Sequence, residues 1–338
     1  MKFSEAWLRQ WVNPTIDTAA LSEQLTMAGL EVDSVTTLAD DFTGIVVGQI
    51  VECGKHPNAD KLNVCQVDTG AKQPFPIVCG GSNVRVGLKV ALATVGAVLP
   101  GDFKIKKSKL RGEPSHGMIC SSKELGIDDP DALPKGIMEL PDDAPIGVDV
   151  RDYLNLDDPI IDIELTPNRG DCASIRGIAC EVGVLNNVPV TAPDSDEVAA
   201  TCDDSQAVAV KDTTVCPRYV GRVLKGISTT ATTPRWMRVR LEQSGVRVIH
   251  PVVDVCNYVM LELGQPMHGF DIARLDGGIT VRRATKNEKL TLLDEQQVTL
   301  RTADLIIADD KKALAIAGVM GGLDSGVTEK TTDVFLES

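Results

Sequence analysis

The sequence contains no apolar run that reaches the roughly 18 residues needed to cross a membrane. Its first eleven residues, MKFSEAWLRQW, carry charged side chains where a secretory signal would be apolar. Both observations argue against a membrane or secreted protein. We therefore expect a cytoplasmic protein that makes no membrane contact.

The sequence also lacks the patterns that hold metals and disulfides. Nine cysteines are scattered along the 338 residues, and no two of them form a C-x-x-C pair. This spacing argues against structural zinc and against a disulfide framework, so we expect reduced thiols and no metal site. Aromatic residues make up only 4% of the chain, so a nucleic-acid surface would have few rings for base stacking.

What is present is an ordinary apolar content of 43% and enough length for two or three domains. The net charge of −14 is unevenly spread. Residues 45–126 hold eleven Lys and Arg against six acidic residues, whereas residues 127–158 hold ten acidic residues and only Lys135 and Arg151. This asymmetry indicates a basic module joined to an acidic connector.

The first half of the chain divides into segments of different periodicity. Residues 1–38 predict short helices, which need a partner because each buries little by itself. Residues 39–148 predict a small closed barrel, because β-rich runs alternate with turn residues. The acidic and proline-dotted residues 127–158 predict a connector that leaves this barrel.

The second half predicts mixed α+β structure. A strand at 160–165 is followed by a helix at 172–186, for which Asp171 is a fair N-cap. This segment is the expected partner of the N-terminal helices. After a polar, acidic linker, short strands surround a helix that begins at Pro234.

One stretch combines aliphatic residues with isolated polar ones. It is DVCNYVMLELGQPMHGFD, at residues 254–271. Its polar groups must face water or meet partners, because an unpaired buried polar group costs about 1–3 kcal/mol. The stretch predicts a strand or short helix that delivers Asn257 and His268 to the edge of a pocket. The alternative is a core segment whose few polar residues are capped locally.

The same stretch resembles the editing-domain motif of the β subunit of bacterial phenylalanyl-tRNA synthetase. Three blocks between residues 56 and 122 resemble the tRNA-binding OB-fold module of that subunit, and ELTPNRGD at 164–171 resembles a further part. The blocks keep the family's order, so the resemblance covers nearly the whole chain and implies the N-terminal portion of such a subunit. The three blocks are HPNADKL, CGGSNVRVG and SKLRGEPSHGMICSS.

The resemblance implies an α+β multidomain fold. An OB-fold barrel at 39–148 would be inserted in a small discontinuous α/β domain made of 1–38 and 152–190. A linker at 191–205 would lead to a mixed α+β editing domain of the B3/B4 type at 206–338, truncated at its C-terminal end.

The barrel would offer cations to tRNA phosphates, most densely in residues 104–111. We expect weak, salt-sensitive contact with the backbone or shape of tRNA rather than base reading. From the residues alone, 104–111 could equally be a solvated hairpin. The expected tRNA-binding residues are Lys55, Lys61, Arg85, Lys104, Lys106, Lys107, Lys109 and Arg111.

The implied editing domain would discharge tyrosine that has been attached in error. A pocket shaped for phenylalanine excludes tyrosine poorly, whereas a second site that hydrogen-bonds the phenol can select it. Glu337 would accept the phenol hydroxyl, and water would attack an already activated ester. The implied catalytic residues are His268, Asn257, Cys256 and Glu337, and the implied tyrosine pocket is formed by Gly318, Gly321, Gly322 and Glu337.

The sequence departs from the family pattern at Cys256 and Gly269 of this domain, and also just upstream at Val248, His250 and Pro251. Cys256 stands where a threonine is usual, so a weak S–H donor replaces a hydroxyl. Gly269 stands in place of an alanine. Taken without the resemblance, the glycines at 318, 321 and 322 indicate a tight turn and only a weak phosphate signal.

The resemblance also implies partners and cofactors. The chain would pair with an α subunit in an (αβ)2 heterotetramer that charges tRNA for phenylalanine. ATP and magnesium would act in the α subunit, and this chain would hold no cofactor. Two alternatives stay open: a non-catalytic tRNA-binding scaffold and a free-standing aminoacyl-tRNA deacylase. An assay of deacylation on mischarged tRNA distinguishes them.

Overall fold

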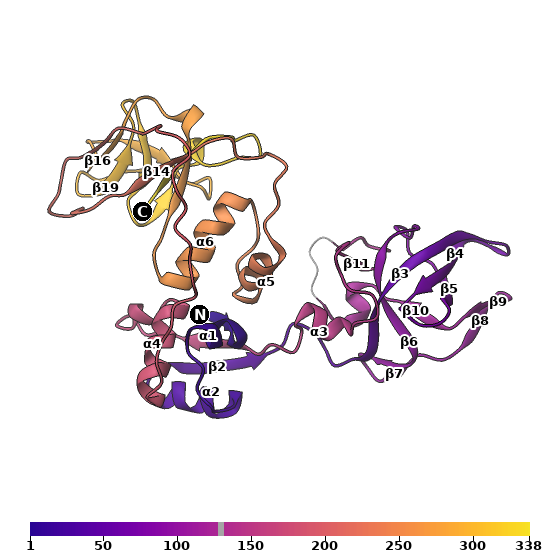
Figure 1. The fold of residues 1–338 in the computed structure, drawn as a ribbon. Coiled ribbons are helices and arrows are strands. Elements are labelled where there is room, and N and C mark those ends of the chain that lie inside the picture. The colour runs from indigo at the N-terminus through magenta and orange to yellow at the C-terminus, as the bar shows by residue number, and fades with distance from the viewer. Residues whose placement is uncertain (128–131) are drawn as a thin grey trace. The chain divides into compact units, whose positions relative to one another are not determined.

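The computed structural model describes residues 1–127 and 132–338 (Figure 1). The chain folds as two units. One consists of residues 35–160, and the other joins residues 1–34 to residues 161–338. Part of the predicted connector, residues 128–131, lies outside the described residues.

The unit of residues 35–160 is built on a curved, seven-stranded sheet. Its main order is β10-β6-β3-β4-β5, and β7 and β11 also pair with β6. The backbone N–H of His116 donates to Pro76 O at 2.8 Å, and that of Val78 donates to Ser115 Oγ at 3.1 Å. These bonds join the two ends of the sheet, so the strands close into a barrel. Val90 and Leu92 of β6 belong to one apolar core and Ala91 and Ala93 to another, so one core lies inside the barrel and the other covers its outer face. The strands are β3 (Thr43–His56), β4 (Ala59–Asp68), β5 (Phe75–Cys79), β6 (Lys89–Leu99), β7 (Phe103–Lys104), β10 (Gly117–Ile119) and β11 (Glu139–Leu140).

The segment after the barrel strands belongs to the same unit. Helix α3 (Val150–Leu154) begins at Asp149, whose side chain accepts from the Arg151 N–H. Val150 and Leu156 are buried in the core that also contains Phe42. We predicted that the second part of the discontinuous domain begins at residue 152, whereas the structure divides the two units after Ile160, because Leu156 packs in the apolar core on the barrel.

The N-terminal part of the other unit is a small α/β layer. Strand β12 lies between β1 and β2, and the helices pack around a core that includes Trp7 and Ile178. Ser174 caps α4 by accepting from the Gly177 N–H, so our prediction of Asp171 as the cap is wrong by three positions. The elements are β1 (Lys2–Ser4), α1 (Glu5–Trp11), α2 (Thr18–Met27), β2 (Glu31–Thr36), β12 (Ile160–Glu164) and α4 (Ile175–Asn186).

Two later helices complete the core of this layer. Met237 of α5 (Arg235–Gln243) and Tyr258 of α6 (Pro251–Leu263) are buried together with Trp7. Figure 1 shows α6 between this layer and the following sheets. The predicted boundary at residue 206 therefore does not separate two independent cores, because both helices after it bury their apolar faces against the N-terminal layer.

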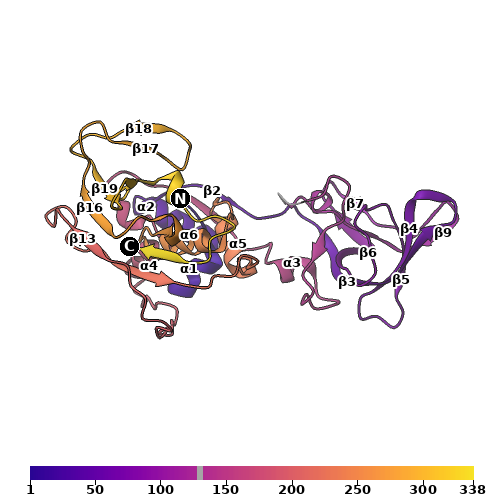
Figure 2. The same ribbon diagram turned by 90° about the horizontal axis from the view of Figure 1, so that it is seen from above.

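The remaining strands form two larger sheets and one hairpin. The five-stranded sheet has the order β13-β16-β19-β20-β21, and the three-stranded sheet has the order β14-β22-β15. Figure 2 shows β13, β16 and β19 side by side. The strands are β13 (Val208–Val210), β14 (Gly221–Leu224), β15 (His268–Asp271), β16 (Ile279–Arg283), β17 (Lys289–Thr291), β18 (Gln297–Thr299), β19 (Leu305–Ala308), β20 (Ala313–Ile316), β21 (Met320–Gly321) and β22 (Val334–Glu337).

The stretch at 251–271 forms first a helix and then a strand, the two kinds of element that we predicted for it. Pro251 occupies the first turn of α6, where a missing N–H costs nothing, and Gly264 ends the helix with φ +76°. The chain then turns and continues as β15. Asn257 therefore lies on a helix and His268 on a strand.

Candidate functional site

The three-stranded sheet brings His268 and Glu337 together. His268 on β15 pairs directly with Glu337 on the central strand β22, and Gly221 on β14 pairs with Glu337 from the other side. Side chains of directly paired residues point to the same face of a sheet. The imidazole and the carboxylate are therefore neighbours on one face.

Three polar atoms near this position are buried and unpaired. Within the described residues, no hydrogen bond of ordinary geometry reaches His268 Nε2, Glu337 Oε2 or the Tyr219 hydroxyl. The Tyr219 hydroxyl nevertheless lies close enough to Glu337 to influence its carboxyl. Glu337 is only 9% exposed. Each such group costs about 1–3 kcal/mol, and several unpaired groups in one place are typical of a site whose ligand supplies the missing partners.

Burial sets the protonation of these groups. Desolvation raises the pKa of Glu337 to about 7, and the Tyr219 hydroxyl opposes part of that rise. Desolvation lowers the pKa of His268. Desolvation and the negative charge of Glu337 both raise the pKa of Tyr219. At neutral pH, His268 is thus a neutral imidazole and Tyr219 a protonated hydroxyl. The His268 ring also packs edge-on against Phe270 at a centroid distance of 4.7 Å.

The three predicted pocket glycines occupy different environments. A Cβ on Gly321 would lie 2.6 Å from His268 Cε1, so this glycine leaves the room that the imidazole fills. A Cβ on Gly322 would lie 2.4 Å from Leu314 O, so Gly322 serves the contact with β20. Gly318 has φ +68° in the turn before β21, and a Cβ there would meet no atom within 4 Å. Of the three, Gly321 is the one in contact with His268.

Asn257 and Cys256 lie on α6. Cys256 is buried, and burial raises the pKa of its thiol to about 11, so the thiol stays protonated. Asn257 is half-buried. Among the described residues, neither side chain hydrogen-bonds to His268 or Glu337. The helix touches β15 through Val252, because a Cβ on Gly269 would lie 3.1 Å from Val252 Cγ1.

The sequence analysis did not identify Tyr219 as a site residue. Its position two residues before Gly221 is the signal that could have found it, because alternate residues of an extended strand share a face. That signal has meaning only once β14 is known to pair with β22.

The predicted cations of the barrel lie on two linked hairpins. Lys55 and Lys61 are exposed on the β3–β4 hairpin, and β8 (Ser108–Leu110) and β9 (Glu113–Ser115) form the second hairpin. His56 joins them: its Nδ1 accepts from the Asn58 N–H at 3.0 Å, which leaves Nε2–H to donate to Leu110 O at 2.9 Å. The exposed cations on or beside the second hairpin are Lys104, Lys106, Lys107, Lys109 and Arg111.

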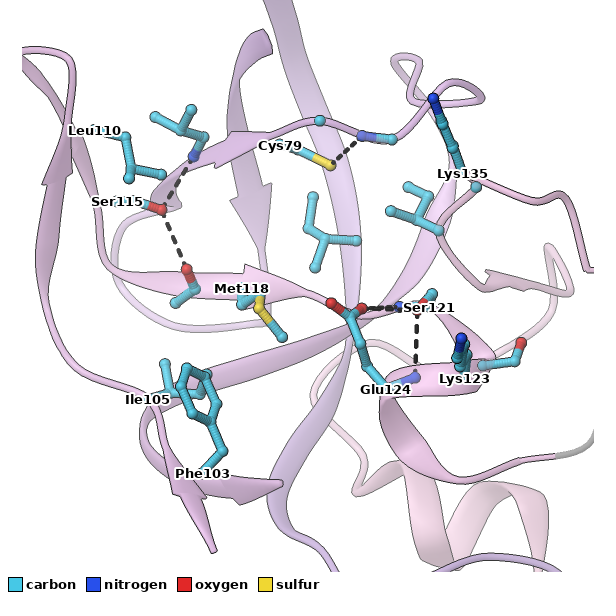
Figure 3. Close-up of a pocket in the computed structure, with 18 of the residues that line it drawn as sticks. Cys79, Phe103, Ile105, Leu110, Ser115, Met118, Ser121, Lys123, Glu124 and Lys135 are labelled. Carbon is cyan, nitrogen blue, oxygen red and sulfur yellow. Dashed lines mark hydrogen bonds between the residues drawn. The ribbon is translucent and has the colours of Figure 1, made fainter. Parts of the chain in front are cut away.

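A cavity of about 1280 Å³ opens beside these residues (Figure 3). Lys104 and Lys106 line it, and so do Lys123 and Lys135, which our list of tRNA-binding residues omitted. Figure 3 shows Phe103 on the opposite side of the cavity from Lys135. Phe103 is 60% exposed, so its ring is available for stacking on a base.

Arg85, also expected to bind tRNA, already has a charged partner. Its Nη1 and Nη2 donate to the two carboxylate oxygens of Glu139 at 2.8 and 2.7 Å. The same contact lowers the pKa of Glu139. A cation that is already paired with a carboxylate attracts phosphate weakly. The structure therefore indicates that Arg85 fixes the end of the barrel and offers no free positive charge.

An acidic cluster elsewhere is likewise satisfied by an arginine. Asp171, Cys172 and Glu181 have ligand-type atoms within 4.8 Å of one another. Arg169 contacts all three, at 3.2, 2.9 and 2.9 Å respectively. The guanidinium thus offsets part of the negative charge of the group and fixes the turn before α4. No helix in the described part of the chain is long and apolar enough to cross a membrane.

Comparison with known proteins gives matches over both units. Residues 45–149 match the family model described as "Putative tRNA binding domain", and residues 215–338 match the model described as "B3/4 domain". A solved N-terminal fragment of the phenylalanyl-tRNA synthetase β subunit of Pyrococcus horikoshii is 16% identical. That likeness covers 53% of this chain and 55% of the fragment, with a TM-score of 0.30, and carries no weight here.

The curated relatives are far more similar. The phenylalanine–tRNA ligase β subunit of Idiomarina loihiensis is 62% identical and that of Pseudoalteromonas translucida is 60% identical, in each case over 100% of this chain. The chain spans 42% of the length of these relatives. With this identity along its entire length, the chain belongs to the family of phenylalanine–tRNA ligase β subunits.

Proposed function

We propose that this chain serves phenylalanine–tRNA ligase in two ways: its barrel binds tRNA, and its His268–Glu337 site hydrolyses tyrosine that has been esterified to the tRNA for phenylalanine. The observation that carries the second role is the buried, unpaired Glu337 carboxylate beside an unpaired imidazole. The tRNA-binding and B3/4 family matches support the pairing of these roles.

The selectivity follows from hydrogen bonding in a desolvated site. The Glu337 carboxylate accepts the hydrogen of a tyrosine phenol and so recovers the cost of its own burial. Phenylalanine brings no donor and leaves the carboxylate unpaired. A site built to bond a hydroxyl rejects the analogue that lacks it far more strongly than an apolar pocket rejects an added hydroxyl.

The hydrolysis is an attack of water on the ester carbonyl. The water oxygen bonds to the carbonyl carbon, the bond from that carbon to the ribose oxygen breaks, and a proton passes to the ribose oxygen. The products are free tyrosine and uncharged tRNA. Neutral His268 orients the water and can take its proton, with Asn257 as a second positioner. Cys256 stays a thiol and acts as no nucleophile.

Hydrolysis of mischarged tRNA tests this role. The enzyme assembled from the complete β subunit and its α subunit should release tyrosine from tyrosyl-tRNA specific for phenylalanine. Glu337→Ala should reduce the preference for tyrosine over phenylalanine, and His268→Ala should reduce the rate. Unchanged deacylation in both variants would remove these two residues from the site.

The barrel has the properties of an OB-fold that contacts the sugar-phosphate backbone of a nucleic acid. Exposed lysines surround the cavity, and a single exposed ring, Phe103, stands at its edge. Binding of tRNA should therefore weaken steeply between low and moderate salt, because each phosphate contact releases counterions. Filter binding or fluorescence titration at several salt concentrations measures the slope, and a flat response would contradict the proposal.

For the whole enzyme we propose ATP-dependent charging of tRNA with phenylalanine by an (αβ)2 assembly in the cytoplasm. ATP and magnesium would bind to the α subunit. A scaffold that only binds tRNA is the alternative, and it predicts no release of tyrosine in the assay above. A free-standing deacylase is the other alternative, and it predicts release without the α subunit.

A further inference from the structure

Tyr219 lies on the same face of the three-stranded sheet as His268 and Glu337. The backbone N–H and C=O of Val220 exchange hydrogen bonds with Ser338, both at 2.9 Å, and Gly221 pairs with Glu337. Tyr219 therefore shares the face of Gly221, diagonally beside Glu337. Its ring stacks on Phe335 at a centroid distance of 6.5 Å.

Gly221 makes this arrangement possible. A Cβ at position 221 would lie 2.1 Å from Phe335 Cζ, so only a glycine lets the Phe335 ring lie across β14. With that ring in place, Tyr219 stacks on it and joins the core between the two sheets. Its hydroxyl is nonetheless buried and, like Glu337 Oε2 and His268 Nε2, makes no hydrogen bond of ordinary geometry within the described residues; it has only a loose contact with the Glu337 carboxyl.

Packing alone does not account for a tyrosine here. A phenylalanine would fill the same volume and bury no unpaired hydroxyl, which costs about 1–3 kcal/mol. An unpaired donor beside an unpaired acceptor matches a ligand that carries both functions on one atom. A phenol is such a group, because its oxygen donates one hydrogen bond and accepts others.

We propose that Tyr219 is a second specificity-determining residue of the tyrosine pocket: its hydroxyl donates to the phenol oxygen of the substrate while Glu337 accepts the phenol hydrogen. This inference rests on the proposed editing function and deepens it. Phenylalanine in the site offers a partner to neither group and leaves them only their loose contact with each other. The discrimination against phenylalanine therefore exceeds what Glu337 alone supplies.

The test uses Tyr219→Phe in the complete β subunit assembled with its α subunit. We measure kcat/KM for deacylation of tyrosyl-tRNA and of phenylalanyl-tRNA. The ratio of the two should fall by about tenfold, because one hydrogen bond of about 1.4 kcal/mol is worth that factor. A merely structural tyrosine would slow both reactions equally and leave the ratio unchanged, which would overturn the inference.

A matched control and a second substrate sharpen the result. Tyr258→Phe removes a buried hydroxyl that is bonded to Arg240 and Glu262, outside the site, and should leave the ratio unchanged. A tRNA acylated with 4-aminophenylalanine offers donors to Glu337 but a nitrogen that accepts poorly. Tyr219→Phe should therefore slow its release less than that of tyrosine, and equal slowing would contradict the proposal.

The wild-type enzyme keeps the proposal testable even if the variant does not fold. It should release 4-aminophenylalanine more slowly than tyrosine, since the amine makes no use of the Tyr219 donor. Equal rates would overturn the role of Tyr219 while leaving the editing function standing. A wild-type enzyme that releases no tyrosine at all would overturn the editing function itself, and the role of Tyr219 with it.

Discussion

At the scale of single residues, the site is defined by unsatisfied groups. Glu337, His268 and Tyr219 are buried with polar atoms that the protein itself does not bond. By contrast, Arg85 and Arg169 form ion pairs with carboxylates of the protein itself. What distinguishes this site is that three such atoms gather on one small sheet, whereas Glu5, Trp11 and Ser244 also bury an unpaired atom within the described residues but lie outside it.

Replacement of Glu337 should change how stability depends on pH. The carboxyl has a pKa of about 7 in the folded protein and a reference value of 4.5. Between these values the folded state keeps a proton that the unfolded state has released, so the free energy of unfolding falls as the pH rises. Glu337→Gln removes that fall, and its stability relative to wild type should rise by up to about 3 kcal/mol between pH 4.5 and 7.

Denaturant unfolding at a series of pH values measures this change. Glu288→Gln is the control of opposite sign, because Arg282 holds the pKa of Glu288 down to about 2. A depressed pKa stabilises the fold above the unfolded value, and that contribution is lost as the pH falls. A Glu337→Gln variant whose stability follows wild type at every pH would contradict the burial of an ionisable carboxylate.

Gly321→Ala should displace the imidazole. A Cβ at this position would lie 2.6 Å from His268 Cε1, so the ring must move. Misplacement of a catalytic group by about 1 Å costs on the order of a hundredfold in rate, so tyrosyl-tRNA deacylation should fall towards that extent. Gly170→Ala is the control, because its Cβ would meet no atom within 4 Å. Full activity in Gly321→Ala would show that the ring position does not matter.

At the scale of elements, the barrel collects its cations through two hairpins that the His56 ring fastens together. The first hairpin is long, with 14 residues in β3 and 10 in β4, whereas β8 and β9 of the second hold only three residues each. The bond from His56 to Leu110 and the bonds between Asn58 and Arg111 fix the second hairpin to the first. The charges therefore form one surface although they come from separate parts of the sequence.

The uncompensated lysines, rather than Arg85, should set the salt dependence of tRNA binding. The combined change of Lys104, Lys106 and Lys107 to alanine should reduce the magnitude of the slope of log K against log salt by about 3, since each phosphate contact contributes nearly one unit. Arg85→Ala is the matched control and should leave the slope nearly unchanged, because Glu139 already compensates that charge. An Arg85 effect as large as that of the lysines would reverse the assignment.

At the scale of the whole molecule, the site depends on residues from both ends of the chain. The Arg240 guanidinium lies 5.1 Å from the centre of the Trp7 ring and 5.9 Å from that of Tyr258, and these two rings stack at 5.0 Å. Tyr258 belongs to α6, which packs against β15. The N-terminal layer thus supports the helix that carries Asn257.

Loss of this support should be visible as a change in one of two unfolding transitions. Arg240→Met should lower the midpoint of the unit of residues 1–34 and 161–338 by about 2 to 6 °C, since a partly buried cation–π group is worth about 0.5–2 kcal/mol. The transition of residues 35–160 should not move. Calorimetry measures both, with the exposed Arg301→Met as control. A shift in both transitions would show that the units unfold together.

Much of the local structure was predictable because it depends on neighbouring residues. The β-rich runs of residues 39–148, the helix after Pro234 and the turn at Gly264 follow from side-chain alternation, proline and glycine. The cap of α4 was misplaced, because Ser174 and Asp171 are both good caps and only the packing of Cys172 chooses between them. The domain boundaries near 152 and 206 likewise depend on packing between distant segments, which the local sequence does not record.

The sequence by itself determined the chemistry that is available: a histidine and a glutamate among aliphatic strands, lysines around one hairpin, and glycines at positions against which rings pack. The tertiary structure alone decided which of these meet. Strand register places His268 and Gly221 on either side of Glu337 and adds Tyr219, whereas the packing of a loop beside β11 brings Arg85 to Glu139. Register depends on how whole faces pack together, and the periodicity of a single strand carries no record of its partner.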